Sequence, residues 1–206
     1  MRNHFGSRPR RVASAIGAAL LIALALTGCA NDGLAKQYAS GDGKGYIAGS
    51  GVVEVKPADR EKPVEFSGKT EDGDTFSSAA HRGHVMVVNF WYAQCPPCRA
   101  EATDLQKANT RFAGDGVVFI GVNTRDSADD AKGFDREWHI TYPSILDVNG
   151  GAVQLAFSGS MRPNSTPTTF VLDKQGRIAA QINGGIDVQP STLDTLIRSA
   201  LAEGGS

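Results

Sequence analysis

The sequence is poor in cysteine, lacks a hydrophobic run long enough to cross a membrane, and carries almost no net charge. Its 206 residues include three cysteines, of which two lie close together, and this excludes a framework of structural disulfides. The longest apolar segment, residues 15–26, is shorter than the roughly 20 residues that a transmembrane helix needs. The chain has no second C-x-x-C pair, and His81, His84 and His139 lack the spacing of zinc ligands, so no metal site is expected.

The charge balance changes when the first 28 residues are set aside. These residues contain four arginines and no acidic residue, so the remainder has 17 Lys and Arg against 22 Asp and Glu, a net charge of −5. A negative protein has no electrostatic attraction to nucleic acid or to an anionic membrane surface. We therefore expect no nucleic-acid partner.

Residues 1–28 have the pattern of a signal peptide. Basic residues come first, the apolar segment 15–26 follows, and small residues precede Cys29. The sequence Leu26-Thr27-Gly28-Cys29 resembles the lipobox of bacterial lipoproteins, which implies cleavage before Cys29 and lipid attachment to its thiol. A transmembrane anchor and an ordinary secretory signal are the alternatives. Export places the remaining cysteines outside the cytoplasm, where disulfides persist.

Three segments are predicted along the chain: a signal peptide at 1–28, a flexible tether at 29–60 and one folded domain at 61–206. The tether is rich in glycine and has no helical or strand periodicity. Within it, only Val52–Val55 is a candidate for a short edge strand.

The folded domain is predicted to be α/β. A hairpin is expected around Gly73, with strands at Val64–Phe66 and Thr75–Phe76. Further strands are expected at His84–Trp91, Val117–Val122, Tyr142–Leu146, Thr168–Leu172 and Arg177–Ile182, and helices at Pro96–Phe112, Ser127–His139, Val153–Phe157 and Gln189–Ala202. Strands that alternate with helices and end in a hairpin imply a central mixed sheet flanked by helices.

Cys95 and Cys98 lie where a buried-strand pattern ends and a helical pattern begins. A C-x-x-C pair in this context is typical of a thioredoxin-like redox site. At a helix N-terminus the Cys95 thiolate, which is the species that attacks disulfides, is favoured by free N–H groups and by the helix dipole. Pro96 and Pro97 have no N–H, so the nearest helical donor is that of Cys98, and we expect a Cys95 pKa that is lowered only in part. A static disulfide and half of a zinc site are the alternatives.

Other residues near the pair are candidates for supporting roles. Glu101 follows Cys98 by three residues and shares its helix face, so its carboxylate could exchange a proton with that thiol; the alternative is a solvated glutamate. Asn89 is polar within an apolar run and needs a partner, either at the site or in a neighbouring backbone. Trp91 is expected in the core or in the wall of the site.

Thr166-Pro167 precedes a late strand. Proline suits a strand start, and the X-Pro bond is the one peptide bond in which the cis form costs little. A cis bond here would bring the loop against the dithiol and present the Thr166 backbone to an incoming chain.

Two separated motifs carry a resemblance to a known family: Val88-Asn89-Phe90-Trp91 with Cys95-Pro96-Pro97-Cys98-Arg99-Ala100-Glu101, and Thr166 to Ile178. Together they resemble the TlpA/ResA-like family, related to DsbE and CcmG, of membrane-tethered extracytoplasmic thioredoxin-fold proteins. The resemblance covers roughly residues 60–203 and includes a segment, Ser127–Ile145, that is similar to the helix-and-strand insert of the family.

The resemblance implies a role for each matching position. Cys95 and Cys98 match the redox pair, Glu101 matches the active-site glutamate of the ResA-like branch, and Pro167 matches the cis-proline of the fold. Asn89 stands where thioredoxins carry a buried aspartate, which implies that Glu101 handles the proton. Two features depart from the family: Gln94 replaces the usual tryptophan before the first cysteine, and residues 161–165 are less similar.

These features predict an extracytoplasmic thiol–disulfide oxidoreductase, anchored by lipid at Cys29 on the outer face of the cell membrane and needing no cofactor. The resemblance implies reduction of client disulfides, in particular those of apocytochrome c, with electrons from a membrane donor of the CcdA/DsbD type. The opposite direction, disulfide donation to exported proteins, is an alternative because direction depends on reduction potential. A copper-delivery module with His139 or Met161 as third ligand, and a lipoprotein without catalytic function, are further alternatives.

Overall fold

The computed structural model describes residues 51–159, 163, 166–184 and 190–204. The expected signal peptide, Cys29, most of the expected tether and Met161 lie outside these residues. Within the described part of the chain, no helix combines the length and the hydropathy that crossing a bilayer requires.

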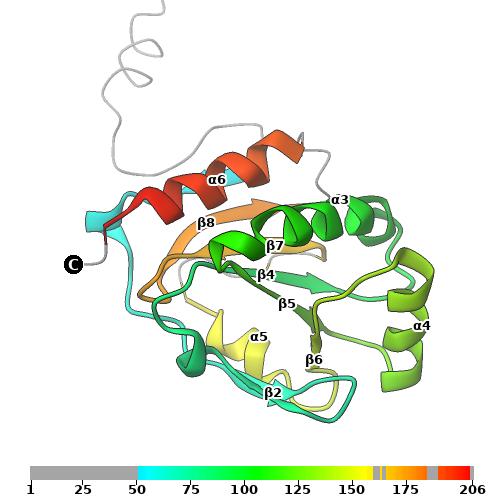
Figure 1. Cartoon of the computed structure of the whole chain (residues 1–206). Coiled ribbons are helices and arrows are strands. Elements are labelled where there is room, and N and C mark those ends of the chain that lie inside the picture. Colours follow the sequence, from blue (N-terminus) through cyan, green and yellow to red (C-terminus); the bar gives the residue numbers. More distant parts are fainter. Residues whose placement is uncertain (1–50, 160–162, 164–165, 185–189, 205–206) are drawn as a thin grey trace, which may run out of the picture. The chain divides into compact units, whose positions relative to one another are not determined.

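A six-stranded mixed sheet forms the centre of the described residues (Figure 1). Its strands, in spatial order, are β1 (Val52–Glu54), β8 (Ile178–Asn183), β7 (Thr168–Leu172), β4 (Met86–Trp91), β5 (Val118–Asn123) and β6 (Ser144–Leu146). Strands β4, β5 and β6 are parallel, whereas β7, β8 and β1 continue from β4 in antiparallel pairs. The predicted α/β class and mixed sheet are confirmed.

Helices cover both faces of this sheet, as Figure 1 shows. Helices α3 (Pro96–Phe112) and α6 (Pro190–Ala202) lie on one face. The opposite face carries α5 (Ala152–Ala156) and the hairpin of β2 (Ser67–Lys69) and β3 (Thr75–Ser77). Helix α4 (Ala128–Trp138) lies beside the β6 edge, and short 3-10 turns occur at Pro57–Asp59, Ser78–His81 and Ala113–Asp115.

Strand β4 is buried along its whole length, and its alternation sets the position of the site. Met86, Val88 and Phe90 point into a cluster on the α5 face that also holds Phe157 and Phe170. The residues between them face the other way, because successive side chains of a strand alternate. Val87 thus joins the apolar cluster under α3 and α6, and Asn89 lies on the same face, toward α3.

Residues 52–60, expected in the tether, belong to the folded structure. Strand β1 pairs with β8, as the candidate edge strand predicted, so the domain boundary at residue 61 is too late. The Arg60 side chain joins this segment to the rest of the domain, in addition to the β1–β8 pairing. Its side chain is 2 % exposed and donates to Asp173, at 2.9 Å, and to Glu203. Composition alone could not distinguish this segment from the flexible glycine-rich tether. Strand β1 is short and apolar, and the ion pair of Arg60 exists only in the folded chain.

Asp173 connects this ion pair to the β7–β8 turn. Burial alone would raise the pKa of its carboxyl, but hydrogen bonds from the Arg177 N–H and from the Arg60 and Arg177 side chains outweigh burial and lower it. A carboxyl with a lowered folded-state pKa stabilises the protein above its unfolded pKa, and this stability is lost as the pH falls.

We therefore predict that Arg60→Met lowers the free energy of unfolding at pH 7 by about 3–5 kcal/mol, because it leaves Asp173 and Glu203 short of a buried partner. The loss should shrink as the pH falls below about 4, where Asp173 of the unfolded chain begins to be protonated, and should continue to shrink toward the lower pKa of the folded state. Urea unfolding at several pH values measures both effects, with Lys62→Met, a change at an exposed cation nearby, as the control. Equal stability of the two variants at pH 7 would contradict the role given to Arg60.

Candidate functional site

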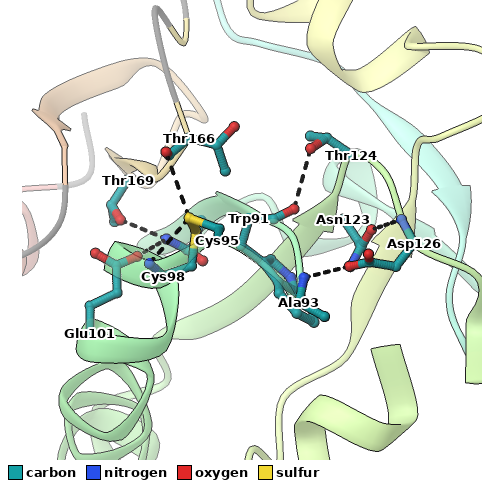
Figure 2. The surroundings of a disulfide bond; sticks show 11 residues. Trp91, Ala93, Cys95, Cys98, Glu101, Asn123, Thr124, Asp126, Thr166 and Thr169 are labelled. Carbon is teal, nitrogen blue, oxygen red and sulfur yellow. Dashed lines mark hydrogen bonds between the residues drawn. A yellow bond between two sulfur atoms is a disulfide. The ribbon is translucent and has the colours of Figure 1, made fainter. Parts of the chain in front are cut away.

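The redox pair lies where β4 ends and α3 begins, as the sequence predicted. Cys95 and Cys98 form a disulfide, with their Cα atoms 5.2 Å apart (Figure 2). Cys95 is the N-cap of α3, and Pro96 and Pro97 occupy its first helical positions. Proline is favoured there because these N–H groups would have no intrahelical acceptor. The two prolines thus favour a helix that begins directly after Cys95 and holds Cys98 in its first turn.

One backbone donor is directed at the N-terminal sulfur. The Cys98 N–H donates to Cys95 Sγ at 3.2 Å, the donor that the two prolines leave available. In the reduced protein the same N–H and the helix dipole would favour negative charge on this sulfur. Nothing equivalent is directed at Cys98 Sγ among the contacts that the structure describes. The environment therefore distinguishes the two sulfurs.

The cis-proline loop lies on the other side of Cys95. The Thr166–Pro167 peptide bond is cis, and the Thr166 carbonyl oxygen lies 3.7 Å from Cys95 Sγ (Figure 2). Cys95 and Cys98 are only 1 % and 2 % exposed, although Gln94, Pro96 and Pro97 beside them are exposed. A partner that reaches the sulfur must therefore approach along this loop and the exposed start of α3.

Glu101 is buried, 2 % exposed, and is not the solvated glutamate that the sequence also allowed. The buried positions of α3 recur every three or four residues, which places Glu101 on the same face as Cys98. Asn89 Nδ2 donates to Glu101 Oε1 at 2.8 Å and to Thr169 Oγ1 at 3.0 Å. The amide thus finds its partners at the site, and it ties α3 to strands β4 and β7. Thr169, which faces Asn89 from the paired strand, was missed by sequence reasoning.

Trp91 forms part of the wall behind the disulfide. It packs in one apolar cluster with Cys95, Cys98 and Phe134, and its Nε1 donates to Ser144 Oγ at 3.1 Å. This contact needs a glycine at position 121, since a Cβ there would lie 2.1 Å from Ser144 Oγ. Trp91 is buried, and its ring contacts that of Phe134 on α4, with the ring centroids 4.4 Å apart.

A second polar group, also missed by sequence reasoning, holds the loop that enters the site. Asp126 Oδ2 accepts from the Ala93 N–H at 2.6 Å and from Asn123 Nδ2 at 2.7 Å (Figure 2). Asn123 Oδ1 in turn accepts from the N–H groups of Arg125 and Asp126. A run of polar residues directly after the buried strand β5 was the available signal, because side chains at the carboxyl ends of adjacent parallel strands meet at one edge.

The described residues contain no cluster of three His, Cys, Asp or Glu side chains that would hold a metal ion. His139 is the exposed C-cap of α4. The copper alternative thus gains no support from the part of the chain that the structure describes.

Comparison with known proteins places this geometry among thiol–disulfide enzymes. Residues 60–181 match the AhpC/TSA family. The chain is 32 % identical to the thiol:disulfide interchange protein HelX of Rhodobacter capsulatus, over 68 % of this chain and 74 % of that protein. It is 25 % identical to the thiol-disulfide oxidoreductase ResA of Halalkalibacterium halodurans, over 63 % of this chain and 70 % of that protein.

Solved structures agree with these relatives. A secreted thiol-disulfide isomerase from Corynebacterium glutamicum superposes with a TM-score of 0.66 at 28 % identity, covering 77 % of this chain and 96 % of the other. The predicted thioredoxin-like fold and the resemblance to the ResA-like family are confirmed.

We predict that Asp126→Ala slows disulfide exchange at neutral pH by roughly tenfold, since a small displacement of reacting groups is enough for such a loss. The variant removes the acceptor of the Ala93 N–H, whereas Asp126→Asn keeps an oxygen in its place and should lose less. The rate of insulin reduction measures the effect, with the exposed Asp129→Ala as control. Exchange as fast in Asp126→Ala as in the control would show that this hydrogen bond does not position the loop.

Proposed function

Because the chain belongs to the AhpC/TSA family and is a thiol–disulfide oxidoreductase related to HelX and ResA, we propose that it works as a reductant of client disulfides outside the cytoplasm. One observation carries the proposal. The buried Cys95–Cys98 disulfide lies at the start of α3, with one N–H directed at Cys95 and a carboxylate, Glu101, on the face that holds Cys98.

In this proposal the reduced protein transfers two electrons to its client. The Cys95 thiolate attacks one client sulfur, a mixed disulfide forms, and the other client sulfur leaves as a thiolate that takes a proton. Cys98 then gives its proton to Glu101 and attacks Cys95 Sγ. The Cys95–Cys98 bond forms, the bond to the client breaks, and the second client sulfur leaves and is protonated. Asn89 orients Glu101 throughout.

The prolines support the reducing direction. A dithiol becomes a strong oxidant when its reduced form is stabilised, chiefly by hydrogen bonds and dipoles that favour the thiolate. In this chain the first two helical positions have no N–H, and only Cys98 donates to Cys95 Sγ. The Cys95 thiolate is therefore less stabilised than in a C-x-x-C pair whose two intervening residues both carry an N–H. This favours a lower reduction potential.

The client proposal combines the site with the resemblance noted in the sequence. The Thr166 carbonyl oxygen, 3.7 Å from Cys95 Sγ, is placed to pair with the backbone of an extended client beside the cis-proline. The ResA-like resemblance suggests apocytochrome c before haem attachment as that client. It also suggests a membrane electron donor of the CcdA/DsbD type, which would return the Cys95–Cys98 pair to its reduced form.

The proposed location is the outer face of the cell membrane, with lipid at Cys29. Its support is the lipobox-like sequence before Cys29 and the relation to a secreted thiol-disulfide isomerase. A lipid anchor joined to the domain by residues 30–50 would keep the dithiol close to a membrane donor.

The reduction potential of the Cys95/Cys98 pair tests the direction, and we predict a value below about −200 mV. Equilibration with glutathione buffers gives the potential. In a second step the reduced protein is mixed with an oxidised C-x-x-C-H peptide, the haem-attachment sequence of c-type cytochromes, and with the same peptide in which the histidine is alanine. A potential above about −150 mV would assign the chain to disulfide donation instead. Equal rates with both peptides would contradict the cytochrome client.

A further inference from the structure

A small cavity lies beside the disulfide, and Cys98 forms part of its wall. Its volume is about 10 Å³, and its wall includes Cys98, Asn89, Asp135, Tyr142 and Ser144. A polar cavity of about this size holds one water molecule when two to four polar groups face it. Asn89, which hydrogen-bonds Glu101, connects this wall to the carboxylate of the site.

Asp135, on α4, supplies the least satisfied polar atom of this wall. Its Oδ1 is buried and has no hydrogen-bond partner among the described residues. Most buried polar atoms in proteins are paired with a protein group or an ordered water, so this oxygen calls for a partner. The other buried atom of this kind is Trp138 Nε1, one turn further along the helix, and Trp138 is not part of the cavity wall.

We propose that a water molecule in this cavity connects Cys98 to Asp135, and that Asp135 is the residue through which the proton exchanged at Cys98 reaches solvent. Cys98 and Glu101 are both almost fully buried, so neither exchanges protons with bulk water directly. Asp135 is only partly buried, which gives it contact with both the cavity and the surface. The inference rests on thiol–disulfide exchange at Cys95 and Cys98 and does not depend on its direction.

The charges around Asp135 suit this role. Burial raises the pKa of Asp135 to about 7, and the negative charges of Glu71 and Asp72 add to the rise, while Arg136 opposes it. Burial raises the pKa of the Tyr142 hydroxyl, and the negative charges of Glu101 and Asp135 add to the rise. Lys132, which pairs with Asp72, and Arg99, which pairs with Glu137 of α4, are further cations of this region. A carboxyl that titrates near neutral pH is able both to accept and to release a proton there.

In the reducing direction, the Cys98 thiol of the mixed disulfide loses its proton, directly or through Glu101, to the cavity water and attacks Cys95 Sγ. The Cys95–Cys98 bond forms and the client sulfur leaves with the electron pair of the broken bond. The proton moves from the water to Asp135 and then to solvent, where the client thiolate takes up another. When the protein is reduced again, the proton returns by the same route.

The test uses 5,5′-dithiobis(2-nitrobenzoic acid), a disulfide whose thiolate product is coloured. The reduced full-length chain releases one thiolate when Cys95 attacks and a second when Cys98 closes the protein disulfide. We expect the second rate constant of the native protein to rise with pH, with an inflection near 7. In Asp135→Asn the inflection should disappear and the second rate at pH 7 should fall by roughly tenfold, while the first phase is unchanged.

Two further variants separate proton transfer from structure. Asp129→Asn, an exposed carboxyl on the same helix, should behave as the native protein. Ala102→Val, which fills the cavity and leaves every titratable group in place, should slow the second phase as Asp135→Asn does.

An unaltered second phase in Asp135→Asn overturns the proposal, and so does an equal slowing of both phases, which would indicate a structural role. If Asp135→Asn does not fold, an unaltered second phase in Ala102→Val overturns it. The reduction potential enters none of these outcomes, so failure of the proposed direction stays distinguishable.

Discussion

The Cys98 N–H that donates to Cys95 Sγ is the contact on which the chemistry of this protein depends. It exists because β4 delivers the chain to the edge of the sheet and two prolines start α3 between the cysteines. The same prolines remove two other donors, so the site polarises one sulfur without the strong thiolate stabilisation of an oxidant. In the proposed function this hydrogen bond favours Cys95 as the attacking sulfur, and the two missing donors favour a reducing pair.

Behind this contact lies a polar layer inside an otherwise apolar core. Asn89 joins Glu101 to Thr169, Trp91 is held by Ser144, and Asp126 holds the loop at Ala93. Buried polar groups of this kind are tolerated only when they are paired, and they fix the geometry around them. Asp135, on α4, has a buried carboxylate oxygen without a partner among the described residues, and it is where we expect the proton to leave.

Much of the fold could be predicted from the sequence, because the signals lie within short stretches of the chain. The apolar run into Trp91 and the prolines after Cys95 fixed a buried strand and a helix start, and three-residue spacing put Glu101 beside Cys98. Contacts between segments that are distant in the chain could not be predicted from the sequence. Arg60 in the expected tether meets Asp173, and Asp126 and Asp135 approach the site only because α4 and the end of β5 lie against it. No spacing along the chain carries that information.

The most direct measurement is the pH dependence of alkylation of each thiol in the reduced protein, followed by peptide mapping. If the Cys98 N–H and the start of α3 favour the Cys95 thiolate, Cys95 reacts first, with an inflection below the ordinary thiol pKa of about 8.5, and Cys98 stays protected. Equal and slow reaction of both thiols at neutral pH, with ordinary pKa values, would contradict the account.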